Sequence, residues 1–462
     1  MTATASASTL PRKGQLARPR TWPIGTADIL LVLIANGVIV VGMWVRHGGL
    51  DLLGSTAGLA TGLGQVTALL GTYLALVGIL FVARVPWIDH VVGSDRLIAW
   101  HRWLGFATLW LLLAHFAFTT LGWALDSGQT VVGEFFDLMS TWDVLIATVG
   151  LVLMAIVAVT SIRYARRRLA YETWYGLHLY AYLGIALAFL HQITIGSDLV
   201  ADPLALWYWV ALYVVTFGLL ILFRVLAPIR RSLRYRMRVV NVVREAPDVV
   251  SIYLAGRHLE QLPVRAGQFF QVRFLDGGGG WWRAHPFSIS AAPNGAWLRL
   301  TIKALGDDSR RMQRMPVGTP VFIEGPYGAF TTARIHRPRV VMIAGGVGVT
   351  PLRAMLEELP PAPGAVTFLY REGEPDAVVF RAELTALAQA RGADLRLLVG
   401  HRGSALMPVD PMAPEALRKL VPDIAAADIL ICGSRPFTQR TLASLKSLGV
   451  PSAQVHAERF GY

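Results

Sequence analysis

The chain has 462 residues, of which 54% are hydrophobic and only 16% are charged, and its mean hydropathy is positive. This composition is typical of a membrane protein, whereas the more polar C-terminal half predicts at least one soluble domain as well. A single cysteine, Cys432, excludes disulfides within the chain, a four-cysteine iron–sulfur centre and a thiolate zinc site. The net charge of +13 does not indicate a nucleic-acid partner, because many arginines flank apolar segments, where they orient a protein in a membrane.

The first 26 residues are rich in Ala, Ser, Thr and Pro and carry four basic side chains. This composition predicts that residues 1–26 form a short disordered cytoplasmic tail. A cleaved signal peptide is the alternative, but the apolar run that follows is long enough to span a bilayer, and no small-residue cleavage site is convincing.

Six apolar segments of spanning length follow within a predicted membrane domain, residues 27–226. They lie near 27–45, 63–83, 99–123, 143–162, 174–195 and 204–224. Lys and Arg concentrate in the tail, in alternate loops and after the last segment, whereas the intervening loops are acidic and carry Arg46 as their only basic side chain. This asymmetry predicts a multi-pass protein of the cell membrane, surrounded by lipid, with both termini in the cytoplasm.

Four histidines lie in two of these segments: His101 and His115 in the third, and His178 and His191 in the fifth. Thirteen residues separate the first pair and twelve separate the second, so each pair spans about 20 Å along a helix. Two such helices side by side bring His101 level with His178, and His115 level with His191. Two facing imidazoles are what a six-coordinate haem iron needs, so the pattern predicts two haem sites. Structural or proton-relay histidines are the alternative.

Helical geometry adds two expectations about this region. A fourteen-residue step returns to nearly the same face, whereas a thirteen-residue step is about 140° off, so the fifth segment should bend or change its winding between His178 and His191. Arg46 and His47 end the first span on the outer side. A cation there can pair with a haem propionate or attract an anionic acceptor, although a membrane-interface anchor is the simpler interpretation.

From about residue 235 the sequence changes to short runs of β-branched and aromatic residues, punctuated by Gly and Pro, with a flexible glycine turn at 277–280. We expect a small antiparallel barrel that ends near Gly328, within a domain of residues 234–335. The runs are RYRMRVVNVV, VVSIYLA, FFQVRFL, WLRLTIKAL and TPVFIEG.

One motif of this barrel points to a flavin. The motif is His285, Pro286, Phe287 and Ser288. A serine at a strand end can hydrogen-bond the edge of a flavin ring, and Phe287 can pack on its apolar part. Further along, Gly306 and the amides of the following helix suit a pyrophosphate. Ser309 belongs to the same turn, where helix capping is the alternative to cofactor binding.

From residue 338 strands and helices alternate, which predicts a parallel sheet with helices on both faces in a domain of residues 336–462. One of these helices is expected over 377–390. Between the first strand and its helix lies a glycine-rich turn, where the backbone can approach a phosphate closely. Its residues are Gly345, Gly346, Gly348, Thr350 and Pro351.

Two further positions complete the predicted site. Cys432 and Gly433 end an apolar strand, and open α/β sheets bind ligands at such strand ends, although a lone cysteine is also an ordinary small buried residue. Phe460, near the C-terminus, can stack over a flavin ring.

Taken together, these motifs resemble the NADPH oxidase / ferric reductase family from about residue 27 to the end. The paired histidines resemble its haem domain, HPFS resembles its flavin motif with His285 where many relatives carry arginine, and GGVGVTP and CGSRPF resemble its nucleotide motifs. The resemblance implies a six-helix haem bundle, an antiparallel FAD barrel and an α/β nucleotide-binding domain. It also implies FAD, two b-type haems and NADPH or NADH, with no side chain assigned as catalytic.

The resemblance further implies that electrons pass from NAD(P)H to an acceptor outside the cell, either oxygen or a ferric chelate. Two other functions stay open: an electron conduit to a specific extracytoplasmic redox protein or a quinone, and a non-redox six-span transporter with an appended reductase fold.

A preference for NADPH over NADH depends on cations that can bind a 2′-phosphate. Arg371 and Arg402 follow predicted parallel strands, and Arg402 is the better candidate for binding the 2′-phosphate. The alternative is that Arg402 is only a solvated arginine in a turn. Neither strand end has an acidic residue immediately placed to hold a free ribose 2′-hydroxyl, although Glu372 and Glu374 come soon after Arg371.

Overall fold

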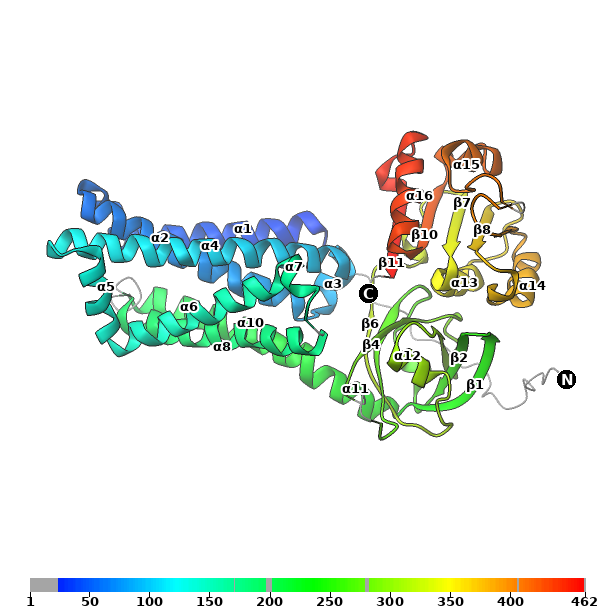
Figure 1. Ribbon diagram of the computed structural model, residues 1–462, viewed down its shortest axis with the longest axis horizontal. Helices are drawn as coiled ribbons and strands as arrows, with labels where there is room; N and C mark the ends of the chain where they lie inside the picture. Colours follow the sequence, from blue (N-terminus) through cyan, green and yellow to red (C-terminus); the bar gives the residue numbers. More distant parts are fainter. Residues whose placement is uncertain (1–23, 170, 197–201, 279–281, 405–406, 461–462) are drawn as a thin grey trace. The chain divides into compact units, whose positions relative to one another are not determined.

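The computed structural model describes residues 24–169, 171–196, 202–278, 282–404 and 407–460 (Figure 1). Nearly all of the expected tail, and half of the expected glycine turn at 277–280, therefore lie outside the described residues. The chain forms two compact units, and the first ends at Val225 where the second begins at Leu226.

The first unit is a helical bundle. Within the described ranges, six helices are long and apolar enough to cross a membrane, which confirms the six predicted spans. They are α1 (Thr26–Arg46), α2 (Thr56–Val82), α4 (Ser94–Ser127), α6 (Trp142–Ser161), α8 (Tyr171–Ile195) and α10 (Pro203–Ile221). Short helices connect them, namely η2 (Asp51–Gly54), α3 (Pro86–Val92), α5 (Val131–Ser140) and α7 (Arg163–Arg166). The last span continues through a π-helical turn (Leu222–Leu226) into α11 (Ala227–Tyr235).

Glycines bring two helix pairs of this bundle into close contact. Between α2 and α4, a Cβ on Gly64 would lie 2.5 Å from the Thr119 hydroxyl. Between α6 and α8, a Cβ on Gly150 or on Gly184 would lie within 2.9 Å of the other glycine's carbonyl oxygen. Small residues are what allow membrane helices to approach so closely, so α2 with α4 and α6 with α8 form two tightly packed hairpins.

The second unit begins with the expected antiparallel barrel. One sheet has the strand order β1 (Arg238–Ala246), β2 (Val249–Ala255), β5 (Trp297–Lys303), and the other has β4 (His285–Ser288), β3 (Phe269–Phe274), β6 (Val321–Tyr327). Bridges from Ile289 to Leu300 and from Arg238 to Pro320 join the edges of the two sheets. The barrel is therefore closed around a core that includes Ile252, Phe270 and Leu300. The short helices η4 (Leu259–Gln261), α12 (Asp307–Met312) and η5 (Thr332–Arg334) lie outside the sheets.

The rest of the second unit is the predicted parallel sheet. Its order is β11 (Val455–Phe460), β10 (Asp428–Ser434), β7 (Val340–Gly345), β8 (Val366–Glu372), β9 (Asp394–Val399). Two separate cores confirm helices on both faces: α13 (Val349–Glu358) and α14 (Arg381–Arg391) cover one face, and α15 (Pro414–Leu420) and α16 (Arg435–Ser447) cover the other. The 3-10 turns are η6 (Gly346–Gly348), η7 (Pro375–Ala377), η8 (Ile424–Ala426) and η9 (Ser452–Gln454).

One predicted boundary in this domain is wrong. The helix expected over 377–390 begins only at Arg381. Phe380 precedes it in the left-handed region, with φ of 61°, and Pro375 starts a separate 3-10 turn. Packing of Val379 and Phe380 into the core overrides the helical pattern at this point.

Candidate functional site

The first pair of facing histidines joins α4 to α8. The ring centres of His101 and His178 lie 6.0 Å apart. His101 Nδ1 donates a hydrogen bond of 2.9 Å to the Gly78 carbonyl on α2, which leaves Nε2 as the nitrogen able to bind a metal. A bond between a metal and an imidazole nitrogen is about 2 Å long, so this spacing suits one metal atom between the two rings.

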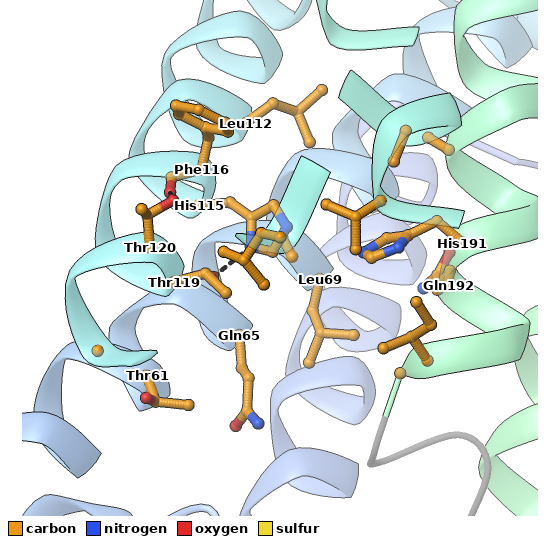
Figure 2. A pocket seen from close by; sticks show the side chains of 18 of the residues that line it. Thr61, Gln65, Leu69, Leu112, His115, Phe116, Thr119, Thr120, His191 and Gln192 are labelled. Atoms are coloured by element: carbon orange, nitrogen blue, oxygen red, sulfur yellow. Dashed lines mark hydrogen bonds between the residues drawn. The ribbon is translucent and has the colours of Figure 1, made fainter. Parts of the chain in front are cut away.

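The second pair lines a cavity of about 800 Å³ whose walls come mainly from α2, α4, α6 and α8. Figure 2 shows His115 and His191 projecting into it from opposite sides, with Leu69 and Leu112 among the apolar lining. His115 Nδ1 donates to the Gly64 carbonyl at 2.9 Å. His191 Nδ1 is buried and has no hydrogen-bond partner among the described residues. Size, apolar lining and two opposed imidazoles fit a haem.

The sequence analysis missed what orients the α4 imidazoles. Gly64, Gly71 and Gly78 recur every seven residues on α2, and the first and last accept the hydrogen bonds from His115 and His101. A carbonyl partner on Nδ1 fixes the tautomer and the ring orientation of a metal-ligating histidine. The heptad of glycines within the predicted span 63–83 was the signal that could have revealed this contact.

Of the two alternatives expected for the fifth span, a bend or a change of winding, the change of winding does not occur. The helix α8 is one unbroken α-helix from Tyr171 to Ile195. His178 nevertheless reaches His101, with its ring packed on Trp174 at 5.0 Å and its Nδ1 3.3 Å from Ser161 Oγ of α6.

The cations at the end of α1 are engaged within the protein. His47 Nε2 lies 2.6 Å from Asp202 Oδ2, and Arg46 Nη2 lies 3.7 Å from the same oxygen. Asp202 also caps α10 by accepting from the Leu204 amide, and this hydrogen bond, more than the two cations, lowers the pKa of the carboxyl. These contacts tie the end of α1 to the start of α10.

The flavin motif forms strand β4, with Ser288 at its end. The Ser288 hydroxyl is buried and, within the described ranges, has no hydrogen-bond partner, as expected of a group that binds a ligand. The His285 ring stacks on Phe287, and its Nε2 lies 3.4 Å from Asp308 Oδ2. Burial lowers the pKa of His285, although Asp308 opposes that shift.

The turn before α12 shows how its residues are used. Ser309 Oγ accepts hydrogen bonds from the amides of Leu305 and Gly306, each at 2.8 Å. These contacts agree with the capping interpretation of Ser309. A Cβ on Gly306 would meet nothing within 4 Å, so the backbone of this turn is open to an approaching ligand.

A second cavity, of about 360 Å³, lies at the carboxyl ends of β7, β8 and β10. Five predicted residues line it together: Gly345, Gly346, Arg371, Arg402 and Phe460. The sequence analysis did not single out three further lining residues with charged side chains: Lys303, Arg440 and Asp410. Arg440 lies on α16 less than two turns after the CGSRPF motif, and that position was the available signal.

The remaining residues of the predicted nucleotide site support the glycine turn from outside the cavity. A Cβ on Gly348 would lie 2.1 Å from the Cys432 carbonyl oxygen, so only glycine allows this contact. Thr350 Oγ1 donates to the Val347 carbonyl at 2.9 Å. Pro351, Cys432 and Gly433 are buried. These residues hold the glycine turn against β10 and do not line the cavity.

The expectation that no acidic residue stands at the strand end near Arg371 is wrong. Strand β8 extends to Glu372, whose side chain lines the same cavity, so an acidic residue does stand at this strand end. Arg371 Nη1 donates to the carbonyls of Glu372 and Leu398. Arg402 Nη1 lies 3.4 Å from Asp410 Oδ2 and is partly exposed. Of the two predicted arginines, Arg402 remains the better placed for a ligand phosphate.

Comparison with protein families gives three consecutive matches. Residues 67–189 match a ferric reductase like transmembrane component, residues 234–331 an FAD-binding domain, and residues 342–442 an oxidoreductase NAD-binding domain.

Individual proteins are similar over shorter stretches. A flavohemoprotein of Xylella fastidiosa is 30% identical over 218 residues, 43% of this chain and 52% of that protein. The glycine betaine monooxygenase reductase subunit of Chromohalobacter salexigens is 28% identical over 242 residues, 49% of this chain and 64% of that protein. The chain thus spans about half the length of the flavohemoprotein. Among solved structures, the FAD/NAD-binding domain of a nitric oxide dioxygenase from Vibrio cholerae covers 50% of this chain and 100% of its own, at 26% identity and a TM-score of 0.42.

Proposed function

Because the chain has the architecture of the NADPH oxidase / ferric reductase-like proteins, we propose that it is an NAD(P)H-dependent oxidoreductase that carries electrons across the membrane. The path runs from cytoplasmic NAD(P)H through FAD and two b-type haems to an acceptor on the far side. One observation carries the proposal: two opposed pairs of imidazoles lie at two levels of one helical bundle. The arginine-rich loops support cytoplasmic termini, so His101 and His178 form the inner level.

The cofactors supply the electron chemistry, since FAD accepts a hydride and releases electrons singly, and haem carries one electron at a time. The chain's own residues bind and orient. His101 and His178 hold the inner haem, and His115 and His191 hold the outer one. Ser288 and Phe287 would hold the flavin, the turn at Gly345 and Gly346 would receive the nucleotide phosphates, and Phe460 would cover the flavin.

If two histidines bind each haem, their side chains would occupy the positions that an acceptor needs to bind the metal, so an acceptor would receive electrons without binding it. Oxygen, giving superoxide, and a ferric chelate, giving ferrous iron, are the two leading acceptors. An electron conduit to an extracytoplasmic redox protein or a quinone is the second candidate. Steady-state NADPH oxidation in detergent, with oxygen, ferric citrate and a quinone side by side, distinguishes them. Failure with all three that a redox partner restores would favour the conduit.

The haem content tests the proposal directly. We expect two b-type haems per chain, measured by the pyridine haemochrome assay against protein concentration. One haem per chain would contradict haem binding by one of the two histidine pairs. No haem at all would favour the alternative of a non-redox six-span transporter with an appended reductase fold.

The nucleotide cavity gives a second prediction. If Arg402 binds the 2′-phosphate, Arg402→Ala should cost NADPH about 1.5–3 kcal/mol in kcat/KM, the range for a hydrogen bond to a charged group, and leave NADH nearly unchanged. Arg396→Ala is the control, because Arg396 lies in the same domain and pairs with Asp394 away from the cavity. A parallel loss for both nucleotides would place the phosphate elsewhere, with Arg440 as the next candidate.

A third prediction concerns the pH dependence of FAD binding. Burial holds the pKa of His285 below its usual value, so the ring is neutral near pH 7 in protein without flavin. An anionic cofactor beside it favours the protonated ring, so binding takes up a proton and affinity should rise as pH falls from 8 towards 6. The limit for one proton is about tenfold per pH unit.

FAD titrations of flavin-depleted, full-length protein at several pH values measure this dependence. His285→Gln should flatten it. His258→Gln should not, because His258 is an exposed histidine of the same barrel. A slope that survives in His285→Gln would assign the proton to another group.

A further inference from the structure

An ionic cluster with buried cations joins the FAD barrel to the nucleotide-binding domain. Its cations are Arg299 on β5 and Arg353 on α13, which are only 3% and 5% exposed. Both bind the same carboxylate, Glu383 on α14: Arg299 Nη1 donates to Oε2 at 3.0 Å, and Arg353 Nη2 donates to Oε1. A single side chain therefore ties a barrel strand to two helices of the neighbouring domain.

The cluster also forms hydrogen bonds with the main chain directly after the flavin motif. The Ser290 carbonyl accepts from Arg299 Nη2 at 2.6 Å and from Arg353 Nη1 at 3.3 Å. Glu357 of α13 accepts from the Ala292 amide at 2.7 Å and from Arg353. Ser290 lies two residues beyond Ser288, whose buried hydroxyl faces the proposed flavin site, so the cluster holds the segment that leaves that site.

The other end of the cluster leads to the nucleotide site. The helix α13 begins at Val349, immediately after the glycine turn, and its residues from Val349 to Leu356 are all buried. Arg353 lies in the middle of this run. Because α13 is packed on all sides, it moves as a rigid body. A shift of Arg353 is therefore accompanied by a shift of the glycine turn that precedes the helix.

Stability alone gives a weak reason for such a cluster. The loss of hydration of buried charges largely offsets their mutual attraction, and well-packed apolar residues often serve stability as well. Two cations and two carboxylates that share their hydrogen bonds do, however, allow one arrangement and penalise others. Arg299 is fixed further by packing over the Phe380 ring, at 4.4 Å from its centre.

We propose that Arg299, Arg353 and Glu383 are positioning residues for hydride transfer, because they set the alignment of the flavin strand and the nucleotide turn. The inference rests on the proposed function. In the step concerned, a C–H bond of NAD(P)H breaks and the hydrogen passes with both electrons to the flavin, leaving NAD(P)⁺. A misplacement of about 1 Å can slow such a step about a hundredfold.

The test uses full-length protein in detergent, loaded with FAD and mixed with NADPH in a stopped-flow instrument. Glu383→Gln keeps the shape of the side chain and removes its charge. We expect the rate of flavin reduction at saturating NADPH to fall about ten- to a hundredfold, while FAD content and the Kd for NADPH stay within about twofold of the unmodified protein. Arg353→Met should behave alike, and the double variant should be little worse than either, since both break one cluster.

Asp394→Asn is the matched control, because it breaks an exposed ion pair with Arg396 in the same domain and should leave the rate unchanged. Glu357→Gln is the milder variant should the others fold poorly. A normal rate per bound flavin in variants that have lost FAD or thermal stability would overturn the inference, because the cluster would then be structural only. If NADPH does not reduce the flavin of the unmodified protein at all, the proposed function fails instead.

Discussion

Replacing His115 or His191 by alanine is expected to abolish electron transfer out of the membrane while leaving reduction of FAD by NADPH intact. The two imidazoles line one cavity, so either substitution would remove one of the two proposed ligands of the outer haem and leave the inner pair, His101 and His178, unchanged. Acceptor reduction should fall by more than about a hundredfold, because even changes in the groups that orient a metal ligand cost 10–100-fold.

The measurement has two parts: haem per chain, expected to drop from two to one, and the rates of flavin and acceptor reduction in the same sample. Thr148→Ala is a suitable control, because Thr148 lines the same cavity but donates its hydroxyl hydrogen to Val144 of its own helix. Loss of flavin reduction to the same extent as acceptor reduction would show that the order of the cofactors is wrong.

Adding one methyl group at Gly64 should disturb the outer haem site almost as strongly. The new Cβ would lie 2.5 Å from the Thr119 hydroxyl and 3.0 Å from the Thr119 amide nitrogen, so α4 must move away from α2. That movement breaks the hydrogen bond from His115 Nδ1 to the Gly64 carbonyl. Overpacking of this kind costs about 1–3 kcal/mol, and we expect Gly64→Ala to lose the outer haem selectively.

Gly78→Ala supplies the comparison. A Cβ at Gly78 meets only His101 Nδ1, at the ordinary distance of 3.6 Å, so the inner haem should be retained. Redox titration of the haem absorbance separates the two sites in each variant. Equal haem loss in both variants would mean that the glycines act on the whole bundle and not on single imidazoles.

Much of this architecture follows from local patterns. Hydropathy alone placed six spans, because a helix must satisfy its backbone hydrogen bonds within itself in lipid. The alternation of strands and helices after residue 338 placed the parallel sheet, and glycines after its first strand placed the turn of the nucleotide site. Such signals lie within one or two elements and need no knowledge of their neighbours.

What escaped prediction depends on which elements meet. The contact between Gly64 and His115 needs α2 and α4 paired in one register, and the convergence of Arg299, Arg353 and Glu383 needs the packing of two domains. Arg440 becomes a candidate only once α16 is seen beside the cavity. Single residues of this kind look like ordinary packing or solvent-exposed groups in the sequence.

The two helices that carry the imidazoles constrain them to different degrees. On α4, both rings are fixed by carbonyls of α2, at 2.9 Å each. On α8, His178 Nδ1 has a hydroxyl 3.3 Å away, and in the part of the chain that the structure describes His191 Nδ1 has no partner. The imidazoles of α4 are therefore constrained before any ligand is bound, whereas those of α8 are constrained less. A ligand bound between the two helices would order the α8 imidazoles more than those of α4.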